Sequence, residues 1–170
     1  ELKNLVRIPS ISFPGFDQQE VIRSAKAVKK LLEKIGAKNI QQLLPKSSYP
    51  CVYGEIITDK NKPTILLYAH HDVQPPMREA LWLSPPFEPE IRNERLYGRG
   101  TADDKAGIII HIAAVELILK ELKSKAPNFK FLIEGEEESG SAGFSQLLEN
   151  HKELLACDAV IVADLGNFSK

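Results

Sequence analysis

The sequence predicts an α/β domain whose central sheet is largely parallel or mixed. Two observations support this fold class. Short apolar segments typical of β-strands alternate with longer segments in which apolar residues recur every three to four positions, as in helices. In addition, residues 64–69 form a continuous apolar run, which is typical of a strand covered on both faces. No repeat or linker divides the 170 residues, so we expect one domain.

The elements follow in order along the chain. An apolar stripe from Val21 to Ile35 predicts an amphipathic helix, and Gly36 is typical of the residue that ends one. The next predicted elements are strands at 40–44, 52–58 and 64–69, a proline-rich loop at 75–89, a helix at 104–123, a strand at 129–134, a helix at 141–155 and a strand at 159–163. The first half of the helix at 104–123 is apolar on every side, so we expect it to be deeply buried.

The composition excludes several classes of partner. A net charge of −1 supplies no basic field for nucleic acid or an anionic membrane surface. The apolar runs are shorter than the roughly 18 residues that a membrane span needs. Cys51 and Cys157 show no ligand spacing and are predicted to be buried thiols in a reducing compartment, which favours the cytoplasm. The chain begins at Glu1 without a methionine, so a preceding segment could have been removed.

Histidine and acidic residues lie just beyond the ends of several predicted elements. They are His70 and Asp72 after one strand, Asp103 before a helix, Glu137 and Glu138 after a second strand, and Asp164 after the last strand. The carboxyl ends of the strands are where open α/β sheets bind ligands. We therefore expect these side chains to converge, although they are far apart in sequence.

Each of these blocks also has a plainer interpretation. His70 could be a core histidine and Asp72 a turn residue, although residues two apart at a strand end point to one side and a carboxylate often orients a metal-bound imidazole. His71 should point the other way. Asp103 could cap the following helix. Against that interpretation, a carboxylate at the buried end of an apolar helix needs a partner, for which a cation is suited.

The glutamate run at 136–138 could be a solvated loop, and Asp164 could simply end a strand before a turn. However, adjacent carboxylates after a buried strand suit a division of labour in which one binds metal and the other accepts a proton from water. Glycines at 98 and 100 indicate special backbone conformations near Asp103. Four such blocks in one chain favour a single site over four coincidences.

Together the blocks resemble those of the co-catalytic zinc hydrolases. This family includes carnosinase-like dipeptidases, glutamate carboxypeptidase, acetylornithine deacetylase, succinyl-diaminopimelate desuccinylase and aminoacylase. The resemblance covers essentially the whole chain and is strongest to the dipeptidase branch. The matching blocks are His-x-Asp-Val-Gln-Pro at 70–75, Trp-x-x-Pro-Pro-Phe-Glu-Pro at 82–89, Leu-Tyr-Gly-Arg-Gly at 96–100 and Glu-Glu-Ser-Gly-Ser at 137–141. Ala69 replaces a common glycine and His71 a common tyrosine, and neither change removes a ligand.

The resemblance implies a three-layer α/β/α domain with a mixed sheet and a site for two divalent ions. Zinc is the expected metal, with manganese or cobalt as alternatives. The implied roles are as follows: His70 and Asp164 bind one ion, Glu138 binds the other, Asp103 bridges both, Glu137 is the general base and acid, and Asp72 orients His70. A cis peptide bond between Asp103 and Asp104 is implied as well.

The resemblance also implies a longer protein. Relatives take a further metal-binding histidine from far downstream and carry an inserted lid domain, neither of which lies within 170 residues. We therefore interpret residues 1–170 as the N-terminal portion of a catalytic metal-binding domain without its lid and C-terminal half, with no second domain and inactive alone.

The implied function is hydrolysis of the amide bond in a dipeptide or small peptide, in a cytoplasmic enzyme that forms a homodimer when complete. One alternative is a deacylase of N-acyl amino acids. Another is a non-catalytic metal-binding or interaction module, which the presence of Glu137 disfavours, because metal binding alone does not require that residue.

Overall fold

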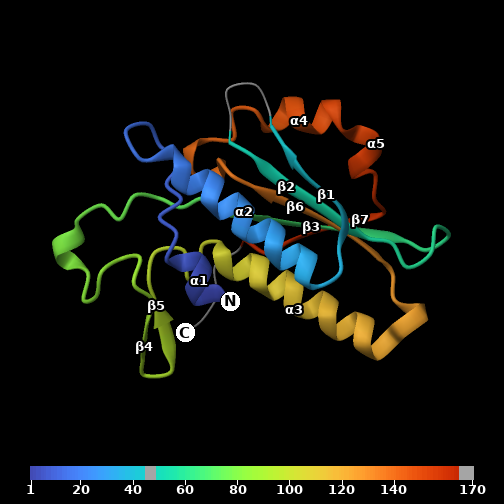
Figure 1. Cartoon of the computed structure of the whole chain (residues 1–170), viewed down its shortest axis with the longest axis horizontal. Helices are drawn as coiled ribbons and strands as arrows, with labels where there is room; N and C mark the ends of the chain where they lie inside the picture. The colour runs from blue at the N-terminus through green and yellow to red at the C-terminus, as the bar shows by residue number, and fades with distance from the viewer. Residues whose placement is uncertain (45–48, 165–170) are drawn as a thin grey trace.

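A mixed five-stranded sheet forms the centre of the protein (Figure 1). The computed structural model describes residues 1–44 and 49–164. The strand order across the sheet is β1-β2-β6-β3-β7, and the strand bounds are Lys38–Leu43 for β1, Cys51–Ile56 for β2, Thr64–His70 for β3, Asn128–Glu134 for β6 and Ala159–Val162 for β7. β1, β2 and β6 pair antiparallel, whereas β3 runs parallel to both β6 and β7. The prediction of an α/β domain with a mixed sheet is confirmed.

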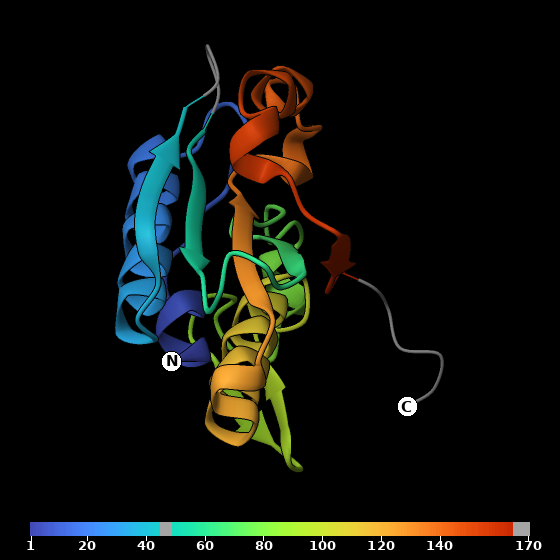
Figure 2. The same ribbon diagram turned by 90° about the vertical axis from the view of Figure 1, so that its right-hand side faces the viewer.

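Helices cover both faces of the sheet and complete the three predicted layers (Figure 2). Their bounds are Leu2–Val6 for α1, Gln18–Lys34 for α2, Lys105–Leu122 for α3, Phe144–Asn150 for α4 and Lys152–Leu155 for α5. The side chains of α2 and α3 pack with those of β2, β3 and β6 in the larger apolar core. The side chains of α4 and α5 belong to a smaller core on the opposite face.

Local sequence explains α2 well. Asp17 caps its first turn by accepting a hydrogen bond from the backbone N–H of Gln19 at 2.9 Å. The apolar stripe predicted from Val21 onward is buried against the sheet. Gly36 follows the helix with φ +84°, the left-handed conformation that glycine adopts readily. The helix therefore begins before and ends close to the predicted limits.

Several elements differ from the predictions. The structure adds α1 and a two-stranded hairpin, β4 (Glu90–Arg92) and β5 (Arg95–Tyr97), both too short to show a period. The helix predicted at 141–155 is two helices, α4 and α5, which meet at His151. A short 3₁₀ turn, Glu79–Leu81, interrupts the predicted proline-rich loop.

Two predictions of burial were wrong. The first half of helix α3 is not buried on every side, because Ile110 within it is 59% exposed. Cys51 is buried as predicted, but Cys157 is exposed in the segment between α5 and β7. Hydrophobicity of a side chain alone does not decide which face meets the sheet.

Within residues 1–44 and 49–164, no helix has the length and apolarity needed to cross a membrane.

Candidate metal centre

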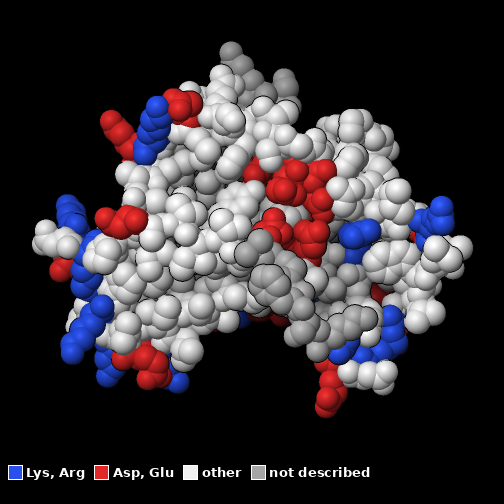
Figure 3. Space-filling view, turned by 180° about the vertical axis from the view of Figure 1, so that it is seen from behind, with Lys and Arg blue, Asp and Glu red and all other residues white. Residues whose placement is uncertain are grey.

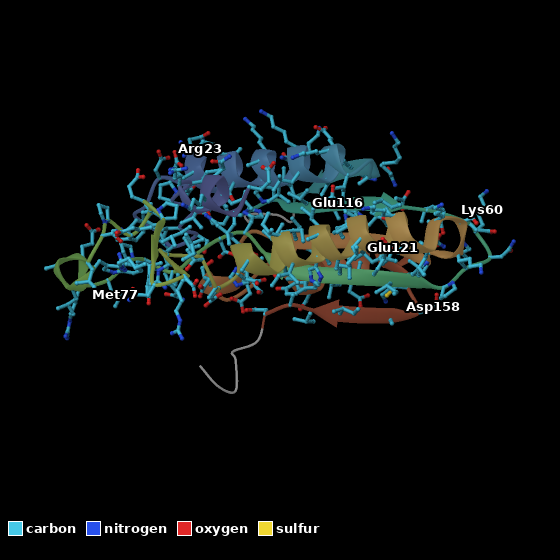
Figure 4. The ribbon with its side chains drawn as sticks, turned by 90° about the horizontal axis from the view of Figure 1, so that it is seen from below. Arg23, Lys60, Met77, Glu116, Glu121 and Asp158 are labelled. Carbon is cyan, nitrogen blue, oxygen red and sulfur yellow. The ribbon has the colours of Figure 1, made fainter. Side chains whose placement is uncertain are left out.

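The sheet register aligns the carboxyl ends of three strands. His70 at the end of β3 pairs with Glu134 at the end of β6, and Tyr68 pairs with Val162 at the end of β7. Residues that follow these strands are therefore carried to the same edge of the sheet. In the view from below, Met77 lies at this end of the molecule, whereas Lys60 and Asp158, which precede β3 and β7, lie at the other (Figure 4).

A close approach of α3 to the end of β7 brings a fourth segment to this edge. A β-carbon added to Gly107, in the first turn of α3, would lie 2.5 Å from the carbonyl oxygen of Ala163. No side chain fits at that distance, so glycine is required for the approach. Asp103 precedes α3 and Asp164 follows Ala163, and the contact therefore brings the two aspartates together.

The imidazole of His70 is the centre of the cluster. Its Nε2 atom lies 3.0 Å from Oδ1 of Asp103, 3.8 Å from Oε2 of Glu137 and 3.8 Å from Oδ2 of Asp164. Ligand atoms of His70, Asp103 and Glu138 all lie within 4.8 Å of one another. His70 and four of the acids predicted to converge with it, Asp103, Glu137, Glu138 and Asp164, thus meet from four segments of the chain.

Asp72 lies behind His70, on the side away from the other acids. Its Oδ1 atom is 3.2 Å from Nδ1 of His70, and both side chains are fully buried. The same carboxylate accepts hydrogen bonds from the hydroxyl of Ser12 at 2.7 Å and from the backbone N–H groups of Glu137 and Glu138 at 3.2 and 3.1 Å. Burial raises the pKa of Asp72, but the contacts with His70 and Ser12 outweigh it and lower the pKa overall.

His71 points away from the cluster, as predicted from its position next to His70. It is fully buried, and its Nε2 atom lies 3.0 Å from the carbonyl oxygen of Pro50. Burial lowers its pKa to about 4, so the ring is neutral at pH 7.

The two adjacent aspartates before α3 have different surroundings, and the peptide bond between them is cis. Asp104 is buried and caps α3, accepting hydrogen bonds from the backbone N–H groups of Gly107 at 3.2 Å and His70 at 3.0 Å. The Asp103 side chain is 59% exposed and directed at His70. The argument that burial would force Asp103 to bind a cation was therefore wrong, because the buried carboxylate is that of Asp104 and backbone groups satisfy it.

The three glutamates after β6 also have different surroundings. Glu136 is buried and accepts hydrogen bonds from the backbone N–H groups of Gly143 at 2.8 Å and Tyr49 at 3.4 Å, so it is a structural residue. Glu137 and Glu138 begin a 3₁₀ turn, Glu137–Ser139, and contribute their carboxylates to the cluster. Burial and the neighbouring acids raise the pKa values of Glu137 and Glu138.

Negative charge dominates the site. Acidic side chains gather near the middle of the face seen from behind, while Lys and Arg lie mostly toward the periphery (Figure 3). In the part of the chain that the structure describes, no lysine or arginine forms an ion pair with the clustered carboxylates. Burial lowers the pKa of His70, but Asp72 and the other acids outweigh it and raise the pKa to about 10. Such a cluster fits a divalent cation, since histidine and carboxylate oxygens are ligands of zinc and manganese.

Geometry allows a second grouping of ligands. His70, Asp104 and Asp164 also place ligand atoms within 4.8 Å of one another. Asp104 is fully buried, whereas the Asp103 carboxylate is exposed and lies 3.0 Å from Nε2 of the imidazole. We therefore favour Asp103 as the ligand. The difference in exposure gives a physical reason for preferring Asp103 to its neighbour as a candidate ligand.

Sequence reasoning missed two residues at the site, Ser12 and Gln74. Ser12 reaches Asp72 from a segment 60 positions away, and Gln74 donates hydrogen bonds to Glu138. A signal existed for Gln74, because His70, Asp72 and Gln74 alternate in sequence and residues two apart on an extended segment share a side. No local signal identifies Ser12.

The sequence and the fold of this chain are similar to those of several known proteins. The chain is similar to the human Beta-Ala-His dipeptidase, with 34% identity over 96% of the chain, and to a Cys-Gly metallodipeptidase of Schizosaccharomyces pombe, also with 34% identity over 96%. The chain superposes on the crystal structure of human carnosine dipeptidase 1 with a TM-score of 0.88 and 30% sequence identity. The superposition covers 99% of this chain and 38% of the human one.

The chain spans about a third of its relatives' length: 35% of the human dipeptidase and 37% of the yeast protein. The model of peptidase family M20/M25/M40 matches residues 66–168, a range that includes His70, Asp103, Glu137, Glu138 and Asp164. The resemblance noted from the sequence blocks is therefore confirmed at the level of the family. With this match and the shared fold, the chain belongs to peptidase family M20/M25/M40.

Proposed function

We propose that the protein hydrolyses the peptide bond of dipeptides or small peptides with the help of two divalent metal ions. The observation that supports this most is the convergence of His70, Asp103, Glu137, Glu138 and Asp164 at one edge of the sheet. The substrate class is suggested by the relatives, which are named as dipeptidases. Because this chain spans about a third of their length, we propose it as the N-terminal portion of the catalytic domain.

The ligand roles that the resemblance implies are compatible with the contacts around His70. We assign His70 and Asp164 to one ion, Glu138 to the other and Asp103 to both, because the accessible carboxylate of Asp103 lies within 4.8 Å of ligand atoms of both His70 and Glu138. Zinc is the ion we expect, since a site that includes histidine suits it, and manganese and cobalt accept the same donors. When bound, divalent ions supply Lewis acidity that polarises an amide carbonyl and lowers the pKa of water.

Glu137 is proposed as the general base. Its carboxylate lies beside His70 without touching it as closely as Asp103 does, at 3.8 Å compared with 3.0 Å, and it remains partly open to solvent. Burial raises its pKa, which brings a carboxylate closer to the range in which proton transfer is efficient near neutral pH. In this role Glu137 removes a proton from water and then donates it to the leaving amine.

Asp72 contacts both the metal-binding histidine and the backbone of the two glutamates. It contacts Nδ1 of His70, which leaves Nε2 directed at the acids, and it accepts the backbone N–H groups of Glu137 and Glu138. A metal-binding histidine is commonly oriented in this way through its second nitrogen. Asp72 is therefore proposed to position both a ligand and the general base.

The test is Glu137→Gln in the whole protein, assayed with Zn²⁺ or Mn²⁺ on Cys-Gly, β-Ala-His and an N-acyl amino acid. We expect kcat for the hydrolysed dipeptide to fall about 10²–10⁴-fold, since this is what general base catalysis contributes. The metal content should not change. Glu121→Gln, on the exposed face of α3, is the control and should retain full activity. A variant at position 137 with wild-type kcat would exclude the assigned role, and preference for the N-acyl amino acid would redirect the substrate class.

A further inference from the structure

We propose that Gln74 is a positioning residue that holds Glu138 and thereby sets the affinity of the second metal site. This inference rests on the proposed function, because it assumes that Glu138 binds an ion. Gln74 lies on the segment after β3, and Glu138 lies 64 positions later in the 3₁₀ turn after β6.

Three contacts join the two residues. The backbone N–H of Gln74 donates to Oε1 of Glu138 at 3.3 Å, and the side-chain amide Nε2 donates to Oε2 at 2.7 Å. The same amide nitrogen also donates to the backbone carbonyl oxygen of Glu138 at 3.2 Å. Both carboxylate oxygens and the main chain of Glu138 are therefore held by one residue.

The neighbouring Asp72 completes the restraint from the same segment. Its carboxylate accepts the backbone N–H of Glu138 at 3.1 Å, so that Glu138 is held at its N–H group, its carbonyl group and its carboxylate. His70, Asp72 and Gln74 alternate along the segment, and each of their side chains serves the cluster. One extended segment thus presents a ligand and restrains another.

The chemistry of an amide suits this task. A free glutamate loses rotamer freedom when it binds a metal, and prior hydrogen bonds reduce that loss because the side chain is already ordered. A carboxylate has about four acceptor sites, so two N–H donors leave others for an ion. An amide carries no charge, and it therefore restrains the carboxylate without competing with the cation, as a lysine or arginine would.

The experiment compares Zn²⁺ binding by the wild-type whole protein with that by Gln74→Met and Gln74→Asn. Methionine matches the length of glutamine without an N–H donor, and asparagine retains an amide that is one methylene too short to reach Glu138. We expect the affinity for one of the two ions to fall 10–100-fold in both variants, a loss typical of removing an outer partner of a metal ligand, with the affinity for the other ion unchanged. The loss should be partial, because the backbone N–H of Gln74 remains.

Gln146→Met, at an exposed position of α4, is the matched control and should bind both ions as the wild type does. Unchanged affinities in both Gln74 variants, or an equal loss at both ions, would overturn the inference. A wild-type protein that takes up no Zn²⁺ would overturn the proposed function as well. Two bound ions without any hydrolysis would contradict only the proposed function, since the role of Gln74 is measured by binding.

Discussion

The backbone of Gly107 in α3 lies against the carbonyl oxygen of Ala163, so closely that a β-carbon on Gly107 would be 2.5 Å from that oxygen. This contact joins the start of a helix to the end of a strand. Asp103 and Asp164, on either side of it, reach the same imidazole for this reason. The geometry of the candidate metal centre therefore depends on a residue that has no side chain.

Gly107→Ala is expected to destabilise the protein although alanine is the better helix former. Alanine in a helix is favoured over glycine by about 1 kcal/mol, but overpacking against a backbone carbonyl costs about 1–3 kcal/mol. We also expect weaker binding of the ion assigned to Asp164, because the added β-carbon would clash with Oδ1 of Asp104 as well as with the Ala163 carbonyl oxygen, so that the Asp104 carboxylate or the strand end must move. Urea unfolding and Zn²⁺ titration measure the two effects.

Gly54→Ala is the control for this substitution. There a β-carbon would meet first the end of the flexible Leu32 side chain, at 3.1 Å, which can move aside. We expect a smaller loss of stability and unchanged metal binding. Equal effects of the two substitutions would argue against a special role for the contact between Gly107 and Ala163.

Ser12→Ala is expected to weaken metal binding, whereas Ser10→Ala is not. Both hydroxyls are buried and donate hydrogen bonds of 2.7 Å, Ser12 to the carboxylate of Asp72 and Ser10 to the backbone carbonyl oxygen of His71. Each substitution removes a hydroxyl donor from a buried acceptor and should lower the free energy of unfolding by about 1–3 kcal/mol. Only Ser12 acts on the residue that orients His70, so only its loss should lower Zn²⁺ affinity, by roughly tenfold.

The outcome that would contradict this expectation is a parallel loss of Zn²⁺ affinity in both serine variants. Such a result would mean that general destabilisation accounts for the effect. Ser12→Thr retains the hydroxyl and should recover most of the affinity if the methyl group fits.

Binding of Zn²⁺ to the metal-free protein at pH 7 is expected to release at least about one proton per protein molecule. The pKa of His70 is about 10 in the cluster, so its imidazole carries a proton at pH 7 that a metal must displace. Calorimetric titration in two buffers with different ionisation enthalpies gives the number of protons released. Asp72→Asn should reduce that number, because Asp72 is the main cause of the raised pKa. No buffer dependence in the wild type would refute the prediction.

The stability of the metal-free protein should fall between pH 6.5 and pH 4 in a manner that depends on His71. Burial lowers the pKa of His71 to about 4, and the unfolded chain has an ordinary value of about 6.5. As the pH falls through this window the unfolded state takes up a proton first, so stability is lost. Between pH 7 and pH 5 the loss amounts to about 2 kcal/mol from this residue.

His71→Gln removes the titration while retaining a side-chain N–H group for the carbonyl oxygen of Pro50. Its unfolding free energy, measured in urea at several pH values, should decrease less on acidification than that of the wild type. His151→Gln, at a partly exposed position, serves as the control and should follow the wild type. Identical slopes for all three proteins would show that His71 does not control the acid response.

The sequence by itself determined the fold class, most element limits and the candidate residues. Periodicity is a local property: the stripe that begins at Val21 and the apolar run of β3 identify a helix and a buried strand without reference to the rest of the chain. The spacing of His70 and Asp72 likewise indicates that they share a side. Ordered blocks of residues indicated the family, which the family model and the fold confirmed.

Only the tertiary structure decided which side chains meet. The roles of the two adjacent aspartates differ because Asp104 caps α3 and Asp103 does not. The contact between Gln74 and Glu138 joins residues that are 64 positions apart in the sequence. The exposed face of α3 was missed because an apolar side chain does not reveal which face of a helix meets the sheet. Such contacts depend on sheet register and helix placement, which long-range packing sets and a local pattern does not contain.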